Sequence, residues 1–134
     1  MKGRKRHILV DTMGLLMRVC VHAANIQERD GAKLLLQPAQ SAAPTSWQLM
    51  WADSGYRGEP FAQWVQENCG CRLEVVKKDP EQQGFAVLPK RWIVERTFAW
   101  FGKCRRLSKD FEQNPQSSEA WIRLSMIHLM LKRL

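Results

Sequence analysis

Two segments near the start of the chain carry the hydrophobic pattern of β-strands. Residues 8–11 and 15–22 are rich in β-branched and aliphatic side chains, and a turn-like Asp-Thr-Met-Gly sequence joins them. In the second segment one face is apolar, because apolar side chains recur at every other position: Leu15, Met17, Val19 and Val21. The pattern predicts an antiparallel hairpin. Residues 1–7 precede it as a basic arm, which either contacts phosphates or is a frayed start of the chain.

The middle of the chain alternates helical and strand-like patterns. Residues 25–37 have a charged opening followed by three leucines, which predicts a helix that Pro38 ends, and residues 38–46 are typical of a surface linker. Residues 47–52 are apolar, as in a buried strand. Pro60 suits the first turn of a helix that stops near residues 68–70, and residues 72–77 predict another strand. Residues 78–90 are mostly loop, and their basic ends make them a candidate DNA-facing flap.

Residues 91–107, RWIVERTFAWFGKCRRL, predict an amphipathic helix. At about 100° per residue one stripe is apolar and wide enough to pack on a core; it contains Ile93, Thr97, Trp100, Cys104 and Leu107, flanked by Val94 and Phe101. The opposite face combines one carboxylate with arginines and small residues: Arg91, Glu95, Ala99, Gly102 and Arg106. A last helix over residues 119–133, with Ser117 or Ser118 as its N-cap, is apolar on most sides.

The predicted elements follow in the order β-β-α-β-α-β-α-α. A hairpin followed by strands that helices separate is typical of an α/β fold, with a mixed sheet flanked by helices. The length of 134 residues suits a single domain. Because the first predicted strand starts almost at the first residue, the sheet would have an unprotected edge, and we expect its first strand to be missing.

The charge of the chain indicates an anionic partner. The sequence has 21 Lys and Arg residues against 13 Asp and Glu, which gives a net charge of +8 and a pI near 9.7. A field of this sign recruits phosphate backbones or anionic surfaces. The sequence has no apolar run of about 20 residues and no signal peptide, so we expect a cytoplasmic protein with reduced thiols. Cys69 and Cys71 lack partners for a zinc site, and the three histidines are scattered in the sequence.

Two acids are candidates for chemistry. Asp53 directly follows a predicted buried strand and precedes glycines, which is where α/β folds place ligand-binding groups, although Asp and Gly also favour ordinary turns. Glu95 lies among arginines on the polar face of its helix. That face could approach a polyanion, or it could be a solvated surface with a weak Glu95–Arg91 pair.

Three sequence blocks together resemble a known family. GRKRHILVDTMG (3–14), WADSGYRG (51–58) and RWIVERTFAWFGKCRRL (91–107) are similar to the C-terminal part of insertion-sequence transposases of the DDE class. The resemblance is closest to the branch with a short interval between the second and third acids, which includes relatives of insertion sequence five. It covers nearly the whole chain and implies a ribonuclease-H-like fold that cleaves and joins DNA strands with divalent metal.

The resemblance assigns roles to individual residues. Asp53 matches the second catalytic acid, Glu95 the third, and Arg91 the arginine one turn before that glutamate. Two positions depart from the family signature: Leu88 stands where a tyrosine would, and Gly102 where a lysine would, so Lys103 or Arg106 supplies that charge instead. The family's first acid lies upstream of residues 3–14, and Asp11, in the predicted hairpin turn, does not match it.

The missing acid bears on activity. The family chemistry uses two Mg²⁺ (or Mn²⁺) ions about 4 Å apart, held by several carboxylates. Asp53 and Glu95 alone would hold one metal weakly, and we expect the two-metal site only in the complete domain. The chain is therefore expected to be a truncated or split-frame transposase, inactive alone. The alternative is an inactive DNA-binding remnant or an inhibitor of transposition.

The expected partner is DNA, both transposon ends and target. No membrane or small-molecule substrate is expected, and the chain is expected to pair with itself or with full-length transposase. Tyr56 either contacts DNA or closes a turn. The full set of predicted DNA contacts is Arg4, Lys5, Arg6, Tyr56, Arg57, Lys90, Arg91, Arg96, Lys103, Arg105 and Arg106.

Overall fold

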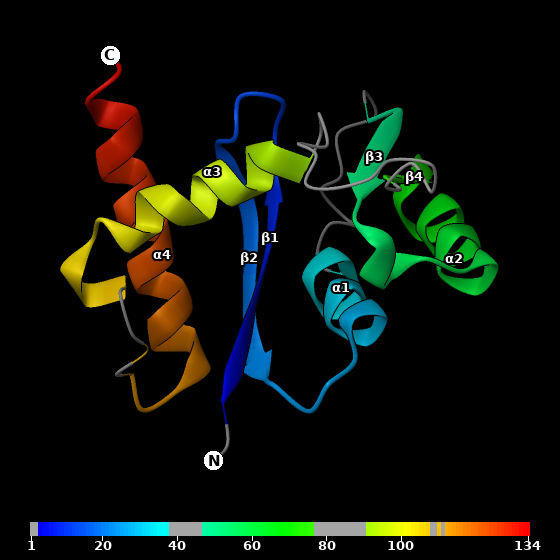
Figure 1. Cartoon of the computed structure of the whole chain (residues 1–134), viewed down its shortest axis with the longest axis horizontal. Coiled ribbons are helices and arrows are strands. Elements are labelled where there is room, and N and C mark those ends of the chain that lie inside the picture. The colour runs from blue at the N-terminus through cyan, green and yellow to red at the C-terminus, as the bar shows by residue number, and fades with distance from the viewer. Residues whose placement is uncertain (1–2, 38–46, 77–90, 108–109, 111) are drawn as a thin grey trace, which may run out of the picture. The chain divides into compact units, whose positions relative to one another are not determined.

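A computed structural model of the protein describes residues 3–37, 47–76, 91–107, 110 and 112–134, without the side chains of residues 91, 92 and 106 (Figure 1). The chain divides into two compact units. Unit 1 comprises Met1–Gln27 and Ile93–Leu134, and unit 2 comprises Glu28–Trp92. The predicted linker over residues 38–46 and the predicted flap over residues 78–90 lie outside the described residues.

Unit 1 begins with an antiparallel hairpin of β1 (Arg4–Val10) and β2 (Leu16–Ala23). His7 lies opposite Cys20, and the register shifts between Leu9 and Val10. The prediction of a basic arm over residues 1–7 was wrong for residues 4–7, which are part of β1. Strand pairing reaches back to Arg4 opposite Ala23, because backbone hydrogen bonding tolerates the cationic side chains of this segment at half-buried positions.

The apolar face of the hairpin packs on two helices of unit 1, α3 (Arg91–Gly102) and α4 (Pro115–Leu131), with a 3₁₀ turn η3 (Arg105–Leu107) between them. The shared core consists of Val19, Val21, Phe101, Leu107, Ile122 and Met126. The helix predicted to run to residue 107 ends earlier, at Gly102. Lys103 N–H and Cys104 N–H donate to the carbonyls of Trp100 and Phe101, which is the tighter i→i−3 bonding common at helix ends.

The start of α4 differs from its prediction. The N-cap is Asn114, whose side-chain oxygen accepts a hydrogen bond from Ser117 N–H at 2.9 Å, and Pro115 is the first helical residue. Neither Ser117 nor Ser118 is the cap. An Asn-Pro pair starts a helix well because Asn satisfies an otherwise unpaired N–H and Pro has no N–H to satisfy.

Unit 2 contains α1 (Glu28–Leu36), β3 (Leu49–Ala52), the 3₁₀ turn η2 (Ser54–Tyr56), α2 (Glu59–Cys69) and β4 (Arg72–Val75). Strands β3 and β4 are parallel, and α2 forms the connection between them. Helix α2 ends at Gly70, which has a φ of 68° that favours glycine. Helix α1 starts at Glu28 and not at residue 25, since Ala24 N–H still bonds across the hairpin to the carbonyl of Gly3 and Ile26 N–H closes a turn onto the carbonyl of Ala23.

The predicted order of strands and helices is confirmed, and the described residues add the 3₁₀ turns η2 and η3. The structure is α/β and contains both antiparallel and parallel strand pairing. Within the described residues the strands form two two-stranded sheets, β1–β2 and β3–β4. A single ribonuclease-H-like mixed sheet stays a prediction. No helix in the described part of the chain is long and apolar enough to cross a membrane.

Candidate metal and nucleic-acid site

Asp53 lies at the carboxyl end of a parallel strand, as its sequence context predicted. It follows Ala52, the last residue of β3, and serves as N-cap of the 3₁₀ turn η2. Its Oδ1 accepts a hydrogen bond from Gly55 N–H at 2.9 Å, and the residue is exposed. A Cβ at Gly55 would come within 3.1 Å of this oxygen, so glycine allows the close approach. The turn therefore holds an exposed carboxylate at a defined place.

Tyr56 ends the same turn and is partly buried. Burial raises the pKa of its phenol, and the charges of Glu28 and Asp53 and a hydrogen bond with Glu28 raise it further. The phenol therefore stays protonated near Asp53 and Glu28, and its ring lies 6.2 Å from that of Phe61. These contacts support the turn-closing role of Tyr56. The neighbouring Arg57 is exposed, and its backbone carbonyl accepts a hydrogen bond from Arg29 at 3.3 Å.

Glu95 lies on the exposed face of α3, one turn before the exposed Ala99. The predicted division of this helix into two faces is confirmed, because Thr97 and Phe101 on the apolar face are 0% and 3% exposed. Gly102, two turns after Glu95, is exposed and would meet no heavy atom within 4 Å of an added Cβ. Along the polar face of α3, the two positions that follow Glu95 are therefore small and exposed residues, Ala99 and Gly102.

The turn of the hairpin anchors α3 immediately after Glu95. Thr97 Oγ1 donates to the carbonyl of Gly14 at 2.6 Å, and Arg96 Nη2 donates to the carbonyl of Met13 at 2.7 Å. Gly14 has a φ of 83°, and a Cβ there would come within 3.0 Å of Thr97 Oγ1. Sequence reasoning missed this contact, because the residues are 83 positions apart.

Asp11 shapes this turn. Its Oδ1 accepts hydrogen bonds from Met13 N–H at 2.9 Å and from Leu15 N–H at 3.0 Å. These are the bonds of an Asp that closes a turn onto its own backbone. The prediction that Asp11 sits in the hairpin turn is confirmed. Its carboxylate holds the turn in the shape in which the carbonyls of Met13 and Gly14 accept hydrogen bonds from α3.

Arg96, one of the predicted DNA contacts, packs inside unit 1. Its guanidinium stacks on the ring of Trp100 at 4.9 Å, and Arg133 stacks on the same ring at 4.6 Å. Cation–π contacts of this kind link α3 with the end of α4. Lys103 and Arg105, by contrast, are exposed on the surface. Lys90 lies outside the described residues, and Arg91 and Arg106 are described by their backbone alone, in α3 and η3.

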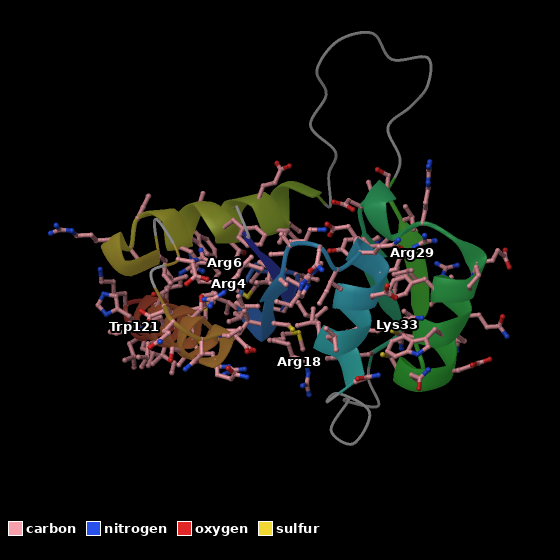
Figure 2. All side chains as sticks on the ribbon, turned by 90° about the horizontal axis from the view of Figure 1, so that it is seen from below. Arg4, Arg6, Arg18, Arg29, Lys33 and Trp121 are labelled. Carbon is pink, nitrogen blue, oxygen red and sulfur yellow. The ribbon has the colours of Figure 1, made fainter. Side chains whose placement is uncertain are left out.

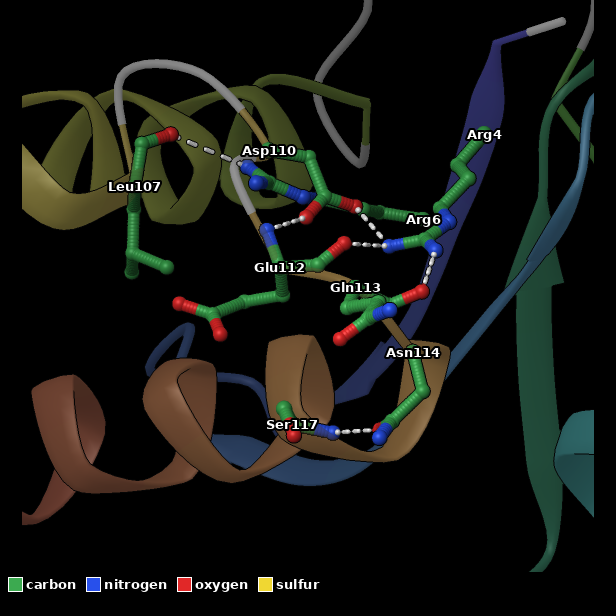
Figure 3. A network of polar contacts seen from close by, with 8 residues as sticks. All are labelled: Arg4, Arg6, Leu107, Asp110, Glu112, Gln113, Asn114 and Ser117. Atoms are coloured by element: carbon green, nitrogen blue, oxygen red, sulfur yellow. Dashed lines mark hydrogen bonds and ion pairs between the residues drawn. The ribbon is translucent and has the colours of Figure 1, made fainter.

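The cationic side chains of β1 bind backbone carbonyls of the chain itself (Figure 3). Arg4 donates to the carbonyls of Glu112 at 2.7 Å and Gln113 at 2.8 Å, and it forms an ion pair with Asp110 at 3.2 Å. Arg6 donates to the carbonyl of Leu107 at 3.1 Å. These bonds fasten β1 to the segment between η3 and α4.

Asp110 and Lys5 also form contacts within unit 1. Burial raises the pKa of the Asp110 carboxyl, but hydrogen bonds from Glu112 N–H, Arg4 and Ser118 together with the charge of Arg4 outweigh it, so the pKa is lowered. Lys5 Nζ donates to the carbonyl of Ile26 at 3.0 Å. The side chains of Arg4, Lys5 and Arg6 therefore stabilise unit 1, and their contact with DNA stays a prediction.

Two histidines that are distant in sequence meet in the hairpin. The rings of His7 and His22 stack with centroids 4.6 Å apart, and the residues are 4% and 6% exposed. His22 Nδ1 lies 2.8 Å from the carbonyl of Ala23. The hairpin thus brings together two histidines that are scattered in the sequence. Cys69 and Cys71 are buried, and burial raises the pKa of Cys71.

Each candidate acid is fixed by neighbours in its own unit. Asp53 belongs to unit 2, with Gly55 and Tyr56, whereas Glu95 belongs to unit 1, with the hairpin turn. Over the described ranges no three His, Cys, Asp or Glu residues gather as a group that could hold a metal ion. The shared site of Asp53 and Glu95 stays a prediction.

The chain belongs to the transposase DDE domain family, whose model matches residues 1–130. It is also 30% identical over 132 residues to a protein of Burkholderia cepacia named "Putative transposase for insertion sequence element IS402". That alignment covers 91% of this chain and 60% of the relative, so the chain spans about three fifths of the length of the relative. No solved structure matches the chain.

Proposed function

We propose that this chain is the C-terminal catalytic part of a transposase from a bacterial-type insertion sequence, of the short-interval branch that resembles insertion sequence five. It acts in DNA strand cleavage and transfer by metal-dependent phosphoryl transfer on a ribonuclease-H-like fold. The observation that carries this proposal is the family match over residues 1–130, because that range includes both acidic blocks, around Asp53 and around Glu95.

Asp53 and Glu95 are the residues that would hold the metal. Both are exposed carboxylates, and carboxylate oxygens are the ligands that Mg²⁺ and Mn²⁺ prefer. The Gly55 N–H bond orients Asp53, while Thr97 and Arg96 fix the helix that carries Glu95. When bound, the metal supplies activation of the attacking oxygen and stabilisation of the leaving oxygen at phosphorus.

The basic residues of the chain would hold the DNA. Arg57 follows the Asp53 turn, and Lys103 and Arg105 follow the Glu95 helix; all three are exposed. Exposed cations that follow each acid in the sequence would bind backbone phosphates and bring a strand to the metal. Lys103 or Arg106 would take the place of the family's signature lysine, because Gly102 stands at that position.

The first acid of the family would come from sequence other than residues 1–134, since the matched blocks contain only the second and third. On this proposal the chain alone has little or no activity. The second candidate function follows from the same observation: a chain with two of the three acids could bind DNA without cleaving it, as a remnant or as an inhibitor that pairs with full-length transposase.

Two assays on the purified chain test the proposal and separate the two candidates. Binding to a labelled DNA duplex should weaken steeply as salt rises, because released counterions drive it. Nicking of a supercoiled plasmid in Mn²⁺ should be weak, should increase when the missing segment of the transposase is added, and should vanish in Asp53→Asn and Glu95→Gln.

Glu67→Gln is the matched control, because Glu67 is an exposed carboxylate on α2 outside the matched acidic blocks. DNA binding with no nicking, even with the missing segment, would favour the remnant or inhibitor. Absence of DNA binding would contradict both candidates.

A further inference from the structure

The turn that carries Asp53 is short. Turn η2 has three residues, Ser54–Tyr56, with Asp53 as its N-cap. Gly55 N–H donates to Asp53 Oδ1 at 2.9 Å, and Tyr56 N–H donates to the carbonyl of Asp53 at 3.1 Å. A single 3₁₀ turn is marginal alone, because its hydrogen-bond geometry is poor and it fixes several residues for few bonds. The orientation of the Asp53 carboxylate therefore depends on the elements that η2 packs against.

Helix α1 packs against η2 within unit 2. Glu28, the first residue of α1, is half-buried and forms a hydrogen bond with the phenol of Tyr56. Its side chain also comes close to Asp53 at Gly55, where a Cβ would lie 3.1 Å from Asp53 Oδ1 and 3.6 Å from Glu28 Cγ. Glu28 thus binds the last residue of the turn and lies beside the glycine whose N–H holds the Asp53 carboxylate.

Arg29, labelled in Figure 2, is the next residue of α1 and contacts the chain just after η2. Its Nη1 donates to the carbonyl of Arg57 at 3.3 Å, and a Cβ at Gly58 would come within 3.0 Å of the same nitrogen. The ring of Tyr56 lies 6.2 Å from that of Phe61 on α2, and this contact does not need the hydroxyl group. Helix α1 therefore binds η2 at its tyrosine and at the residue that follows.

We propose that Glu28 and Tyr56 are positioning residues for Asp53: their hydrogen bond holds η2 on α1 and keeps the Asp53 carboxylate in the orientation that binds a divalent metal ion. A carboxylate that already has this orientation loses less conformational freedom on binding, so its affinity for the metal is higher. Partners outside the ligand set contribute to metal sites in this way. The inference rests on the proposed function, in which Asp53 is a metal ligand, and extends it to two residues that act through the turn.

Amide exchange, measured by NMR on protein with ¹⁵N-labelled glycine, tests the positioning without metal. Tyr56→Phe keeps the ring and removes the hydroxyl group. We expect exchange of Gly55 N–H, which is bonded to Asp53, to become about three- to tenfold faster. Gly70 N–H is bonded to the carbonyl of Gln66 in α2 and provides the control in the same spectrum. Its exchange should not change, because the effect is local to η2.

Two substitutions of Glu28 test the other side of the hydrogen bond. Glu28→Ala removes the acceptor and should speed exchange of Gly55 N–H as Tyr56→Phe does. Glu28→Gln keeps an oxygen that accepts from the phenol, so exchange should stay close to that of the wild type. This rescue by the conservative variant separates the hydrogen bond from the charge of Glu28.

Titration with Mn²⁺, followed by the EPR signal of the free ion, measures the consequence for the site. Tyr56→Phe should weaken Mn²⁺ binding by about three- to tenfold. The same substitution should have no further effect in Glu28→Ala, because the hydrogen bond is already lost there. Asp30→Asn is the matched control and should bind as the wild type does, since Asp30 is an exposed acid of the same first helical turn.

Three results would overturn the proposal. The first is unchanged exchange of Gly55 N–H in Tyr56→Phe. The second is exchange that rises equally at Gly55 and Gly70, which would mean that Tyr56 stabilises unit 2 as a whole. The third is equal Mn²⁺ binding by Tyr56→Phe and a wild type that binds the ion. A wild type that binds no Mn²⁺ would contradict the proposed function, and exchange at Gly55 would then decide alone whether Glu28 and Tyr56 position Asp53.

Discussion

Thr97 is the side chain that most directly couples the hairpin to the helix that carries Glu95. It is 0% exposed, and its hydroxyl donates to the carbonyl of Gly14 at 2.6 Å and contacts the carbonyl of Ile93 in its own helix at 3.1 Å. Leaving a buried carbonyl without its donor costs more free energy of folding than the hydrogen bond itself contributes. A hydroxyl group two residues from the candidate acid is therefore one of the contacts that position α3, beside Arg96 and Phe101.

We expect Thr97→Val to lower the free energy of unfolding by about 1–3 kcal/mol, because valine keeps the shape but leaves the carbonyl of Gly14 without its donor. Thr97→Ser retains the hydroxyl and should lose less. Urea denaturation of the three proteins measures the difference. A Thr97→Val variant as stable as the wild type, beside a destabilised Thr97→Ser, would show that packing of the threonine methyl group, and not the hydrogen bond, holds the helix.

Asp110 is the residue at which stability should respond to pH. Its pKa is lowered from the ordinary value of 3.8, so the folded protein binds this proton less readily than the unfolded chain does. The stabilising contribution is present above pH 3.8 and is lost as the pH falls through the lower, folded pKa. Asp110→Asn should therefore be less stable than the wild type at neutral pH.

The measurement is thermal unfolding of the wild type and Asp110→Asn over a series of pH values. The gap between the two melting temperatures should narrow below pH 3.8, the ordinary pKa of the carboxyl. A gap that is constant with pH would mean that the carboxylate charge does not contribute and that the side chain acts only through its size.

At the scale of elements, the contact between the hairpin turn and α3 leaves little room for an added methyl group. Gly14 has a positive φ, and a Cβ there would meet both Thr97 Oγ1 at 3.0 Å and Arg96 Nη2 at 3.1 Å. Gly14→Ala should destabilise unit 1 by more than about 1 kcal/mol. Urea denaturation again provides the measurement.

Gly102 provides the matched control for Gly14. It lies at the exposed end of α3 with no heavy atom within 4 Å of an added Cβ. Because alanine favours helix, Gly102→Ala should be neutral or stabilise by up to about 1 kcal/mol. If Gly14→Ala were as harmless as Gly102→Ala, the turn would not be packed on α3 as described.

The elements themselves could be predicted from the sequence, whereas their ends and contacts could not. Hydrophobic spacing identified every strand and helix of the described chain in order, because burial of one face determines the period. The ends of the helices depend on local capping, which the hydrophobic pattern does not contain: Asn114 caps α4 in place of a serine, and α3 ends at Gly102. Arg4 binds Gln113, 109 positions away, and no local pattern encodes such a pair.

The residues of the candidate site could be predicted from the sequence, whereas their neighbours could not. Asp53 and Glu95 could be chosen from the sequence, since one follows a strand and the other lies on the polar face of a helix. The neighbours that fix them, Tyr56 with Glu28 and Thr97 with Gly14, depend on tertiary packing. The role of Arg4 and Arg6 was also hidden, because an arginine that binds backbone carbonyls looks the same in sequence as one that binds phosphate.

At the scale of the whole molecule, the chain order places the two acids on different units. Unit 1 is made of both ends of the chain, and unit 2 is the sequence between them. Asp53 therefore belongs to unit 2, and Glu95 belongs to the C-terminal segment of unit 1. The net charge of +8 favours DNA for the molecule as a whole. The proposed transposase site requires that the two acids act on the same metal.

Calorimetric titration of the chain with Mn²⁺ tests this claim most directly. We expect weak binding in the wild type that disappears in Asp53→Asn and equally in Glu95→Gln, because each acid alone is too poor a ligand set. Glu67→Gln should bind as the wild type does. Binding that survives either substitution, or a wild type that binds no Mn²⁺, would contradict a site shared by Asp53 and Glu95.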